Sequence, residues 1–171
     1  CDFGPTAFAS VRRAIIYTIN RPAFAQTFTG GYGSVVDGPY YEGFSAFKAV
    51  KDSIVLNKYT YSADSAVDEL VGGWVYNVRG EAFDASKDDI RYKKLEGYEL
   101  SKDNLNFKSN DGKYSTVKID GAYYMPLAIN WYGTQPNSVT DQLITAWQTN
   151  PDSTTKIGMY ITYTSTEFAP G

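Results

Sequence analysis

The chain has 171 residues, which is enough for one domain with a buried core. Its composition, 43% hydrophobic and 20% charged, is that of a globular protein, and no apolar run approaches the ~20 residues of a membrane span. The net charge of −3 offers no basic surface for nucleic acid, and the lack of histidine with a single cysteine excludes Ser–His and Cys–His catalysis.

Aromatic residues with a polar tip are unusually frequent, since the chain has 15 tyrosines and 3 tryptophans. Such side chains suit binding surfaces, because they combine a large rigid area with a hydrogen bond. Tyrosine also favours β-strands, so a β-rich fold explains the same composition. Composition alone therefore leaves both interpretations open.

The N-terminal segment predicts two helices followed by a loop. In residues 6–20, apolar or small side chains recur at helical spacing on one face, namely Val11, Ala14, Ile15, Thr18 and Ile19. Pro22 suits the first turn of a second short helix that includes Phe24 and Phe28. Residues 29–43 contain five glycines and a proline and are therefore predicted to form a loop.

Residues 61–74 predict a third helix. Ser62 is a suitable N-cap, and Asp64 lies in the first turn, where the helix dipole favours a negative charge. Ala66, Val67 and Leu70 form a short apolar stripe. Gly72-Gly73 is predicted to end the helix as C-cap glycines.

Residues 74–130 predict β-structure with polar turns. We expect a hairpin at 74–83, a strand containing Leu105 and Phe107, and turns at Asp111-Gly112 and Asp120-Gly121. The run 123–133 has the strongest strand pattern.

The last part of the chain predicts a strand, a helix and another strand. The helix spans 137–150 and places Val139, Leu143, Ile144 and Trp147 on one face, and the strand spans 156–168. With the strand before it, this unit predicts a parallel βαβ crossover.

Acidic side chains gather in two groups, and each group is predicted to be solvated charge. Asp64 and Asp68-Glu69 fall on a helix surface, and Asp88-Asp89 falls in a lysine-rich turn. Asn110-Asp111-Gly112 predicts a turn and not a calcium loop, because the later ligand positions are missing. The glycine-rich loop lacks the Walker lysine. We therefore expect no metal and no cofactor.

The strongest binding pattern lies where the 123–133 strand ends and the 137–150 helix begins. In open α/β folds, ligands gather at the carboxyl ends of strands beside helix N-termini. Aromatic rings with several amides and hydroxyls at that place suit peptides or sugars. The alternative is structural, with a buried tryptophan and an asparagine N-cap. The six candidate residues are Asn130, Trp131, Tyr132, Thr134, Gln135 and Asn137.

Three stretches, taken in order, resemble a known family. "VRRAIIYTINRPAF" is similar to its helix pair through Val11, Arg12, Ala14, Ile15, Ile19, Asn20 and Arg21. "YSADSAVDELVGGW" is similar to its second landmark through Tyr61, Ala66, Leu70, Gly73 and Trp74, without the usual proline and lysine. "LAINWYGTQPNSVTDQLITAWQ" with "IGMYITY" is similar to its strand–loop–helix–strand unit. The family is the bacterial extracellular solute-binding proteins of family 5, the dipeptide- and oligopeptide-binding group of ABC importers.

The resemblance implies a mixed α/β fold. Residues 1–171 would be a single domain, most of the C-terminal lobe of a two-lobed, Venus-flytrap (periplasmic-binding-protein type II) protein, with a central mixed sheet flanked by helices. Residues 77–120 lie outside the family pattern and predict a β-rich insert. By position, the resemblance implies that the strand-end residues face the ligand, with Tyr32, Tyr40 and Tyr41 as weaker candidates.

The same resemblance implies a binding protein and not an enzyme. It would capture a peptide or another small solute between two lobes and deliver it to a membrane permease. Two alternatives remain: a self-standing tyrosine-rich module for a carbohydrate or a cell-surface partner, and a hydrolase, which would need two acids near Trp131 that the sequence does not offer.

Cys1 has two interpretations, a lipid-bearing first residue or a residue from the interior of a longer chain. Only Asp2-Phe3-Gly4-Pro5 separates it from a helix, whereas a lipoprotein cysteine normally precedes a flexible tether. The family places a buried extended segment at this position, so we expect Cys1 to lie in an interior strand. The parent protein, with its other lobe, is expected to be extracellular or periplasmic and lipid-anchored, without membrane insertion of this segment.

Overall fold

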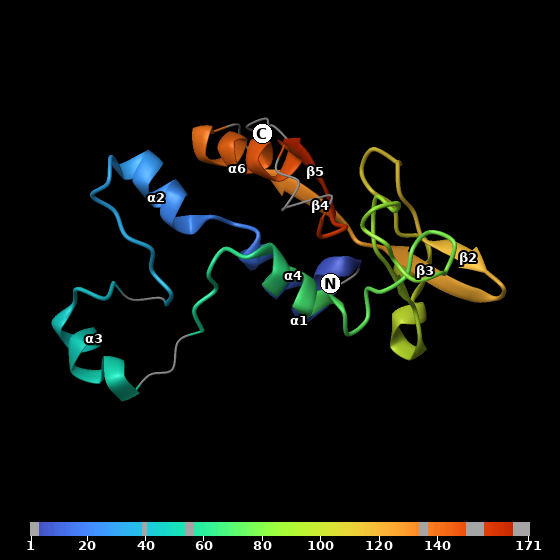
Figure 1. Ribbon diagram of the computed structural model, residues 1–171, viewed down its shortest axis with the longest axis horizontal. Coiled ribbons are helices and arrows are strands. Elements are labelled where there is room, and N and C mark those ends of the chain that lie inside the picture. Colours follow the sequence, from blue (N-terminus) through green and yellow to red (C-terminus); the bar gives the residue numbers. More distant parts are fainter. Residues whose placement is uncertain (1–3, 39–40, 54–56, 134–136, 150–155, 166–171) are drawn as a thin grey trace, which may run out of the picture.

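The computed structural model describes residues 4–38, 41–53, 57–133, 137–149 and 156–165. Its helices are η1 (Pro5–Ala7), α1 (Ala9–Tyr17), α2 (Arg21–Thr29), α3 (Ser45–Val50), η2 (Lys51–Ser53), α4 (Ala63–Leu70), η3 (Gly97–Leu100), α5 (Lys102–Leu105) and α6 (Ser138–Thr149). Its strands are β1 (Tyr92–Lys94), β2 (Val117–Ile119), β3 (Ala122–Pro126), β4 (Ala128–Gly133) and β5 (Tyr160–Ser165). In Figure 1, α1 and α4 lie at the centre, between an arm that carries α2 and α3 and an opposite end that contains β2 and β3.

Helices α1 and α4 pack together as their apolar patterns predict. Val11 and Ala14 of α1 and Ala66 and Leu70 of α4 have no solvent exposure. The Ser62 hydroxyl accepts a hydrogen bond from the backbone N–H of Ser65 at 3.1 Å, so the predicted N-cap of α4 is confirmed.

The predicted C-cap of α4 is wrong. The helix ends at Leu70, and its C-cap residue Val71 keeps right-handed backbone angles and donates its N–H to the Val67 carbonyl. Gly72 and Gly73 do not adopt positive φ, because the chain passes directly into Trp74, whose N–H also bonds the Leu70 carbonyl.

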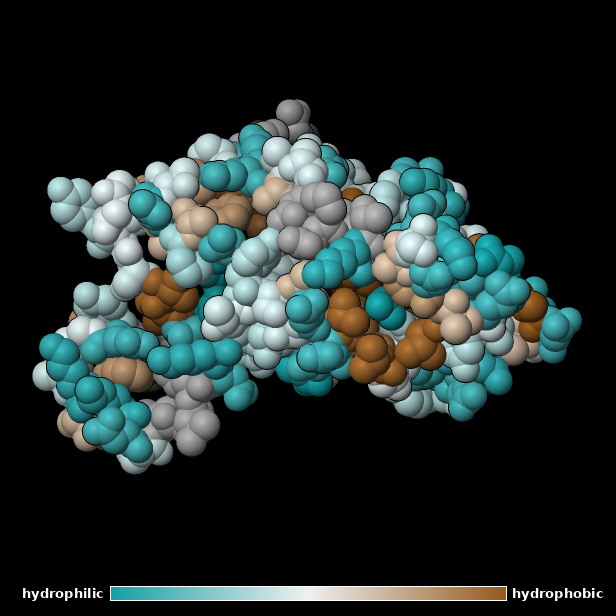
Figure 2. All heavy atoms as spheres, in the orientation of Figure 1, coloured by the Kyte–Doolittle hydropathy of each residue, from teal (hydrophilic) through white to brown (hydrophobic). Residues whose placement is uncertain are grey.

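The arm, residues 21–53 without 39–40, contains α2 and α3. Asn20 caps α2 by accepting from the Ala23 N–H, and Gly30 ends it in the left-handed conformation. Neither α2 nor α3 contains a buried residue. Figure 1 shows the arm standing away from the rest of the molecule, and Figure 2 shows hydrophobic side chains open to view on it. The sequence predicted α2 but not α3.

The predicted β-region forms a three-stranded antiparallel sheet with the order β1-β3-β2. The turn between β2 and β3 is the predicted one, since Asp120 and Gly121 both have positive φ. The 74–83 hairpin is reduced to one isolated bridge between Tyr76 and Ala82. The predicted strand around Leu105 is wrong, because Ser101 caps a short helix, α5, that includes this residue.

The predicted βαβ unit is present, with β4 and β5 paired in parallel from Ala128–Tyr160 to Gly133–Ser165. Helix α6 connects them. Trp147 on its inner face is buried and donates to the hydroxyl of Thr18, the C-cap residue of α1, at 2.8 Å. Leu143 is half-buried, whereas Val139, expected on the same face, is 48% exposed. Ile157, Met159 and Ile161 are buried, as their spacing predicts. The predicted start of the last strand at 156 is wrong, because residues 156–158 form a turn with Gly158 at positive φ and β5 begins at Tyr160.

The strand-like run 123–133 is divided at Leu127 between the two sheets. β3 belongs to the antiparallel sheet and β4 to the parallel pair. Arg91 connects them: its backbone carbonyl accepts from the Leu127 N–H, and its guanidinium donates to the carbonyls of Ile157 at 2.7 Å and Trp74 at 3.0 Å. Because Arg91 is only 7% exposed, burial lowers the pKa of its guanidinium.

Candidate functional site

The structure describes four of the six predicted strand-end residues, Asn130, Trp131, Tyr132 and Asn137, while Thr134 and Gln135 lie outside the described residues. The first three end β4, and Asn137 precedes α6. Their backbone positions therefore match the predicted strand-to-helix junction. Their side chains, however, have different surroundings.

Asn130 and Tyr132 are held by the loop 108–111, which belongs to the predicted insert. The Asn130 side chain donates to the Lys108 carbonyl at 2.9 Å and accepts from the Asn110 N–H at 2.9 Å. The Tyr132 hydroxyl donates to the Asn110 side chain at 2.6 Å. The amide of Asn130 is therefore engaged within the chain, and the 61% exposed Tyr132 keeps its ring open to solvent with its hydroxyl fixed.

Trp131 lies on the opposite side of β4 from Asn130 and Tyr132, as strand alternation requires. It is half-buried and makes edge contacts with Trp147 at 5.2 Å and Tyr163 at 5.3 Å between ring centroids. The Asn137 side chain accepts from the Thr140 N–H at 2.9 Å and so caps α6. These contacts agree with the structural alternative for both residues.

The weaker candidates belong to the arm. Tyr32 is 99% exposed, and Tyr41 contacts Phe44 of the arm at 5.7 Å. Tyr40 lies outside the described residues. The described contacts of these tyrosines do not join them to β4.

A second aromatic group, which was not predicted from the sequence, lies beside the start of β5. The rings of Tyr114 and Tyr160 are 4.9 Å apart at 70°, and the Lys113 ammonium lies 5.0 and 5.1 Å from their centroids. These rings, with Asp89, Gln148, Met159 and Ile161, line a pocket of about 400 Å³, which we call the Tyr114 pocket. Only the high tyrosine content signalled it, since its parts lie far apart in sequence.

Hydrogen bonds make the Tyr114 pocket electrostatically distinct. The Asp111 carboxylate accepts from the Ser109 hydroxyl at 2.6 Å and the Tyr160 hydroxyl at 2.5 Å, which holds the pKa of Asp111 at about 2. The same bond, with burial, raises the pKa of Tyr160 to about 12. The Tyr114 hydroxyl is the main cause that raises the pKa of Lys113, and Asp89 and Asp111 add to it.

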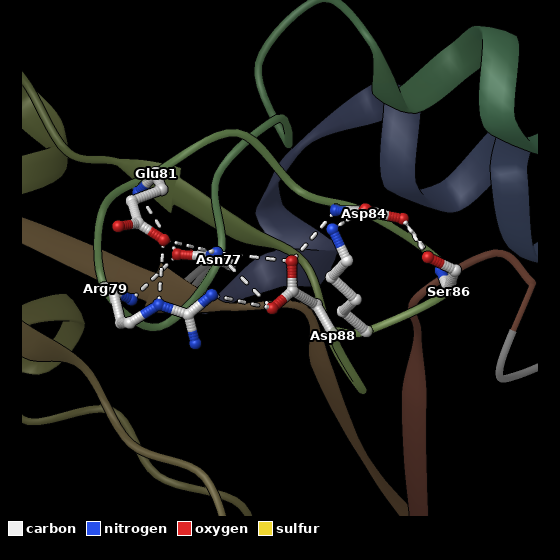
Figure 3. A network of polar contacts seen from close by, with 7 residues as sticks. Asn77, Arg79, Glu81, Asp84, Ser86 and Asp88 are labelled. Carbon is white, nitrogen blue, oxygen red and sulfur yellow. Dashed lines mark hydrogen bonds and ion pairs between the residues drawn. The ribbon is translucent and has the colours of Figure 1, made fainter.

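A polar network braces the loop that supplies Asp89 (Figure 3). The Asp88 carboxylate accepts from the side chains of Asn77 and Arg79 and from the backbone N–H of Asp84. The Asp88 side chain is 7% exposed, so its prediction as a solvated charge is wrong: the network encloses it. These bonds lower the pKa of Asp88, because they favour its charged form.

The acidic residues of the predicted group on α4 remain near the surface. Asp64 is 87% exposed and pairs with Lys156 at 3.3 Å, and Glu69 pairs with Arg13 at 2.8 Å. The predicted turn at Asp111-Gly112 is confirmed by the positive φ of Gly112. Within the described ranges, no group of three acidic, cysteine or histidine side chains could hold a metal ion. The helices in the same ranges are too short or too polar to traverse a lipid bilayer.

Known proteins are similar to this chain in structure but not detectably in sequence. No model of a protein family matches it, and no curated protein does. Similar solved structures include NikA from Brucella suis in complex with Fe(III)-EDTA, with 18% identity, a TM-score of 0.55 and 98% of this chain covered. An oligopeptide-binding protein from Thermus thermophilus complexed with a pentapeptide is 15% identical, with a TM-score of 0.54 and 93% of this chain covered. AppA from Bacillus subtilis in complex with a nonapeptide is 16% identical, with a TM-score of 0.53 and 95% of this chain covered.

The chain spans only 25%, 20% and 24% of the lengths of these three proteins. Two of the three are oligopeptide-binding proteins, and the third holds a metal chelate. At these identities the similarity establishes the fold alone. It is the predicted mixed α/β fold, as in one lobe of a type II periplasmic binding protein. The described strands form an antiparallel sheet and a separate parallel pair, and not the single central mixed sheet that was expected.

Proposed function

We propose that this chain is most of the C-terminal lobe of a family 5 solute-binding protein, which captures a peptide or a related small solute between two lobes for an ABC-importer permease. One observation carries the proposal. Nearly the whole chain matches about a quarter of the length of each of three proteins whose structures hold peptides or a metal chelate. The role is binding and not catalysis. The longer parent would work outside the cytoplasm, held by a lipid anchor.

The β4 end supports this role through Tyr132. Its ring is exposed, while its hydroxyl is fixed to Asn110, so a ligand could stack on it with little loss of side-chain freedom. Trp131 packs behind it against Trp147 and makes the strand end rigid. We include Thr134 and Gln135, which follow in sequence, in the proposed contact set.

The loop 108–111 extends this proposal to the segment 77–120. Asn110 contacts Asn130, Tyr132 and Thr164, and so it joins the segment to both parallel strands. We propose that 77–120 is an insert that shapes the binding face. An insert at this place would alter ligand preference relative to family members without it, because it adds polar groups beside the ligand.

A single lobe should bind its solute weakly, because half of the contacts are missing and the two lobes cannot close over the ligand. We expect calorimetry with this chain and mixed peptides to detect no millimolar or tighter binding. Clear micromolar binding by this chain would contradict the half-site interpretation.

The decisive experiment uses the full-length gene product and a peptide library, with retained peptides identified by native mass spectrometry. We expect peptide binding that Tyr132→Ala weakens about tenfold, because truncation removes the stacking ring. Tyr98→Ala is the matched control, since Tyr98 is 85% exposed on η3. Equal effects of the two substitutions, or no peptide retained, would contradict the proposal.

A further inference from the structure

The Tyr114 pocket lies apart from the proposed peptide contacts. Tyr160 at its wall pairs with Ala128 at the first position of the β4–β5 register, whereas Tyr132 pairs with Thr164 four residues later. At the rise of a β-strand, this separation is about 13 Å. The pocket volume of about 400 Å³ is within the usual range of small-molecule sites, roughly 300–1,000 Å³.

The two rings of the pocket are held in place before any ligand arrives. The bond to Asp111 fixes the Tyr160 hydroxyl, and the edge contact fixes Tyr114 against Tyr160. Met159 and Ile161, 2% and 6% exposed, form an apolar floor. The aromatic wall is therefore rigid before binding, so the free energy of binding is reduced little by the cost of ordering its side chains.

The charges around the pocket favour a neutral ligand. Lys113 contributes one ammonium, while Asp89 and Asp111 contribute two carboxylates that act on it. A bound anion would be repelled by both carboxylates, and a bound cation would have to displace the ammonium of Lys113. A neutral ligand meets neither penalty.

The rim offers both kinds of hydrogen-bonding group. Lys113 donates, Asp89 accepts, and the exposed amide of Gln148 does both. Hydroxyl groups, which donate and accept, match such a rim. The 70° angle between the tyrosine rings leaves no pair of parallel faces for a flat heterocycle, whereas one ring face suffices for the C–H face of a sugar.

We propose that the Tyr114 pocket is a binding site for a neutral pyranose sugar, with the tyrosine wall packing against its C–H face and Asp89, Lys113 and Gln148 binding its hydroxyls. The described wall residues of this site all lie in this chain, although Asp111, which fixes Tyr160, belongs to the same loop 108–111 as Asn110, which fixes Tyr132. The site would allow the protein to hold a glycan while a solute occupies the cleft.

The test uses this chain with glucose, galactose, N-acetylglucosamine and their β-linked disaccharides as probes. Saturation-transfer NMR identifies the bound sugar, and calorimetry gives its dissociation constant. We expect millimolar or tighter binding, which Asp89→Ala and Gln148→Ala each weaken by about tenfold. Both side chains are exposed, so the fold should persist. Asp103→Ala and Gln142→Ala, also exposed but outside the pocket, are the matched controls.

The outcomes separate this proposal from the peptide proposal. No sugar binding at about 100 mM, where a millimolar site would be nearly saturated, or binding unchanged by Asp89→Ala and Gln148→Ala, would overturn it. Sugar binding lost in Tyr132→Ala but kept in Asp89→Ala would overturn it too, by moving the sugar to the strand end. Tighter, Asp89-dependent binding of choline or triglycine would refute the neutral-sugar class. Failure of the full-length protein to retain peptides would leave this site unaffected.

Discussion

The arm and the body of this molecule contain helices of similar length with similar caps, but only those of the body are packed. In the body, α1 and α4 each bury two side chains completely, whereas α2 and α3 bury none. The arm leaves large apolar side chains exposed, such as Phe28 at 39% and Phe44 at 59%. Helical periodicity and caps therefore explain where helices form, while burial determines how much each one contributes to global stability.

This difference predicts two levels of stability. Opening of the arm exposes little new apolar surface, so it should cost little free energy and precede global unfolding. The body should unfold as one unit, because Arg91 connects the two sheets and Trp147 connects α6 to α1. Substitutions that remove the same kind of contact in different surroundings can test this comparison.

The largest effect is expected at Arg91. Arg91→Ala removes two guanidinium bonds and leaves the carbonyls of Ile157 and Trp74 unpaired in the core, which should cost about 3 kcal/mol of unfolding free energy. Arg12 also donates to two backbone carbonyls, at 2.8 Å each, but at the surface. Arg12→Ala should therefore cost less than about 1 kcal/mol. Denaturant unfolding followed by tryptophan fluorescence measures both losses. Arg12 and Arg91 both belong to the body, so equal losses would mean that burial does not determine how much such bonds stabilise the fold.

A smaller effect is expected at the helix caps. Ser62→Ala should cost about 1 kcal/mol of global unfolding free energy, because α4 unfolds together with the body. Asn20→Ala removes an equivalent bond from α2 and should leave the global value unchanged. Hydrogen exchange should instead show faster exchange confined to the amides of α2. A global loss from Asn20→Ala comparable to that from Ser62→Ala would mean that the arm and the body unfold together.

The sequence predicted the elements whose signals are local. The apolar spacing of α1, the Ser62 cap and the Asp120-Gly121 turn depend on residues within a few positions of one another. The division of the strand run at Leu127 could not be predicted, because both halves are equally apolar and only pairing with Arg91 and with β5 distinguishes them. The enclosure of Asp88 depends on partners up to eleven residues away, and a charge pattern does not reveal it.

The candidate site shows the same limit. The junction of β4 and α6 was predicted because strand and helix patterns meet there. The use of Asn137 as a cap was foreseen as one of two alternatives. The contacts of Asn110 with Asn130 and Tyr132 join positions 20 and 22 residues apart, and the Tyr114 pocket joins residues from 89 to 161. Such groups form only when the loops fold onto the sheet.

The smallest expected effect is on tyrosine ionisation in the body. The pKa of Tyr160 is raised to about 12, mainly by its bond to Asp111, and burial raises the pKa of Tyr92 to about 12. In the unfolded chain the pKa of a tyrosine is near 10, so the folded protein holds these two protons more tightly. The protonated hydroxyls of Tyr160 and Tyr92 therefore contribute fully to the stability of the fold below about pH 10. That contribution should disappear as the pH rises from about 10 to 12.

Asp111→Asn isolates the Tyr160 part of this effect. Asparagine keeps an acceptor for the Tyr160 hydroxyl but loses the negative charge, so the pKa of Tyr160 should move down towards 10 while that of Tyr92 stays high. Ultraviolet titration of tyrosinate, with Tyr160→Phe to assign the signal, measures the shift. If the titration is the same with and without the Asp111 carboxylate, Asp111 does not hold Tyr160, and the rigid wall of the Tyr114 pocket loses its support.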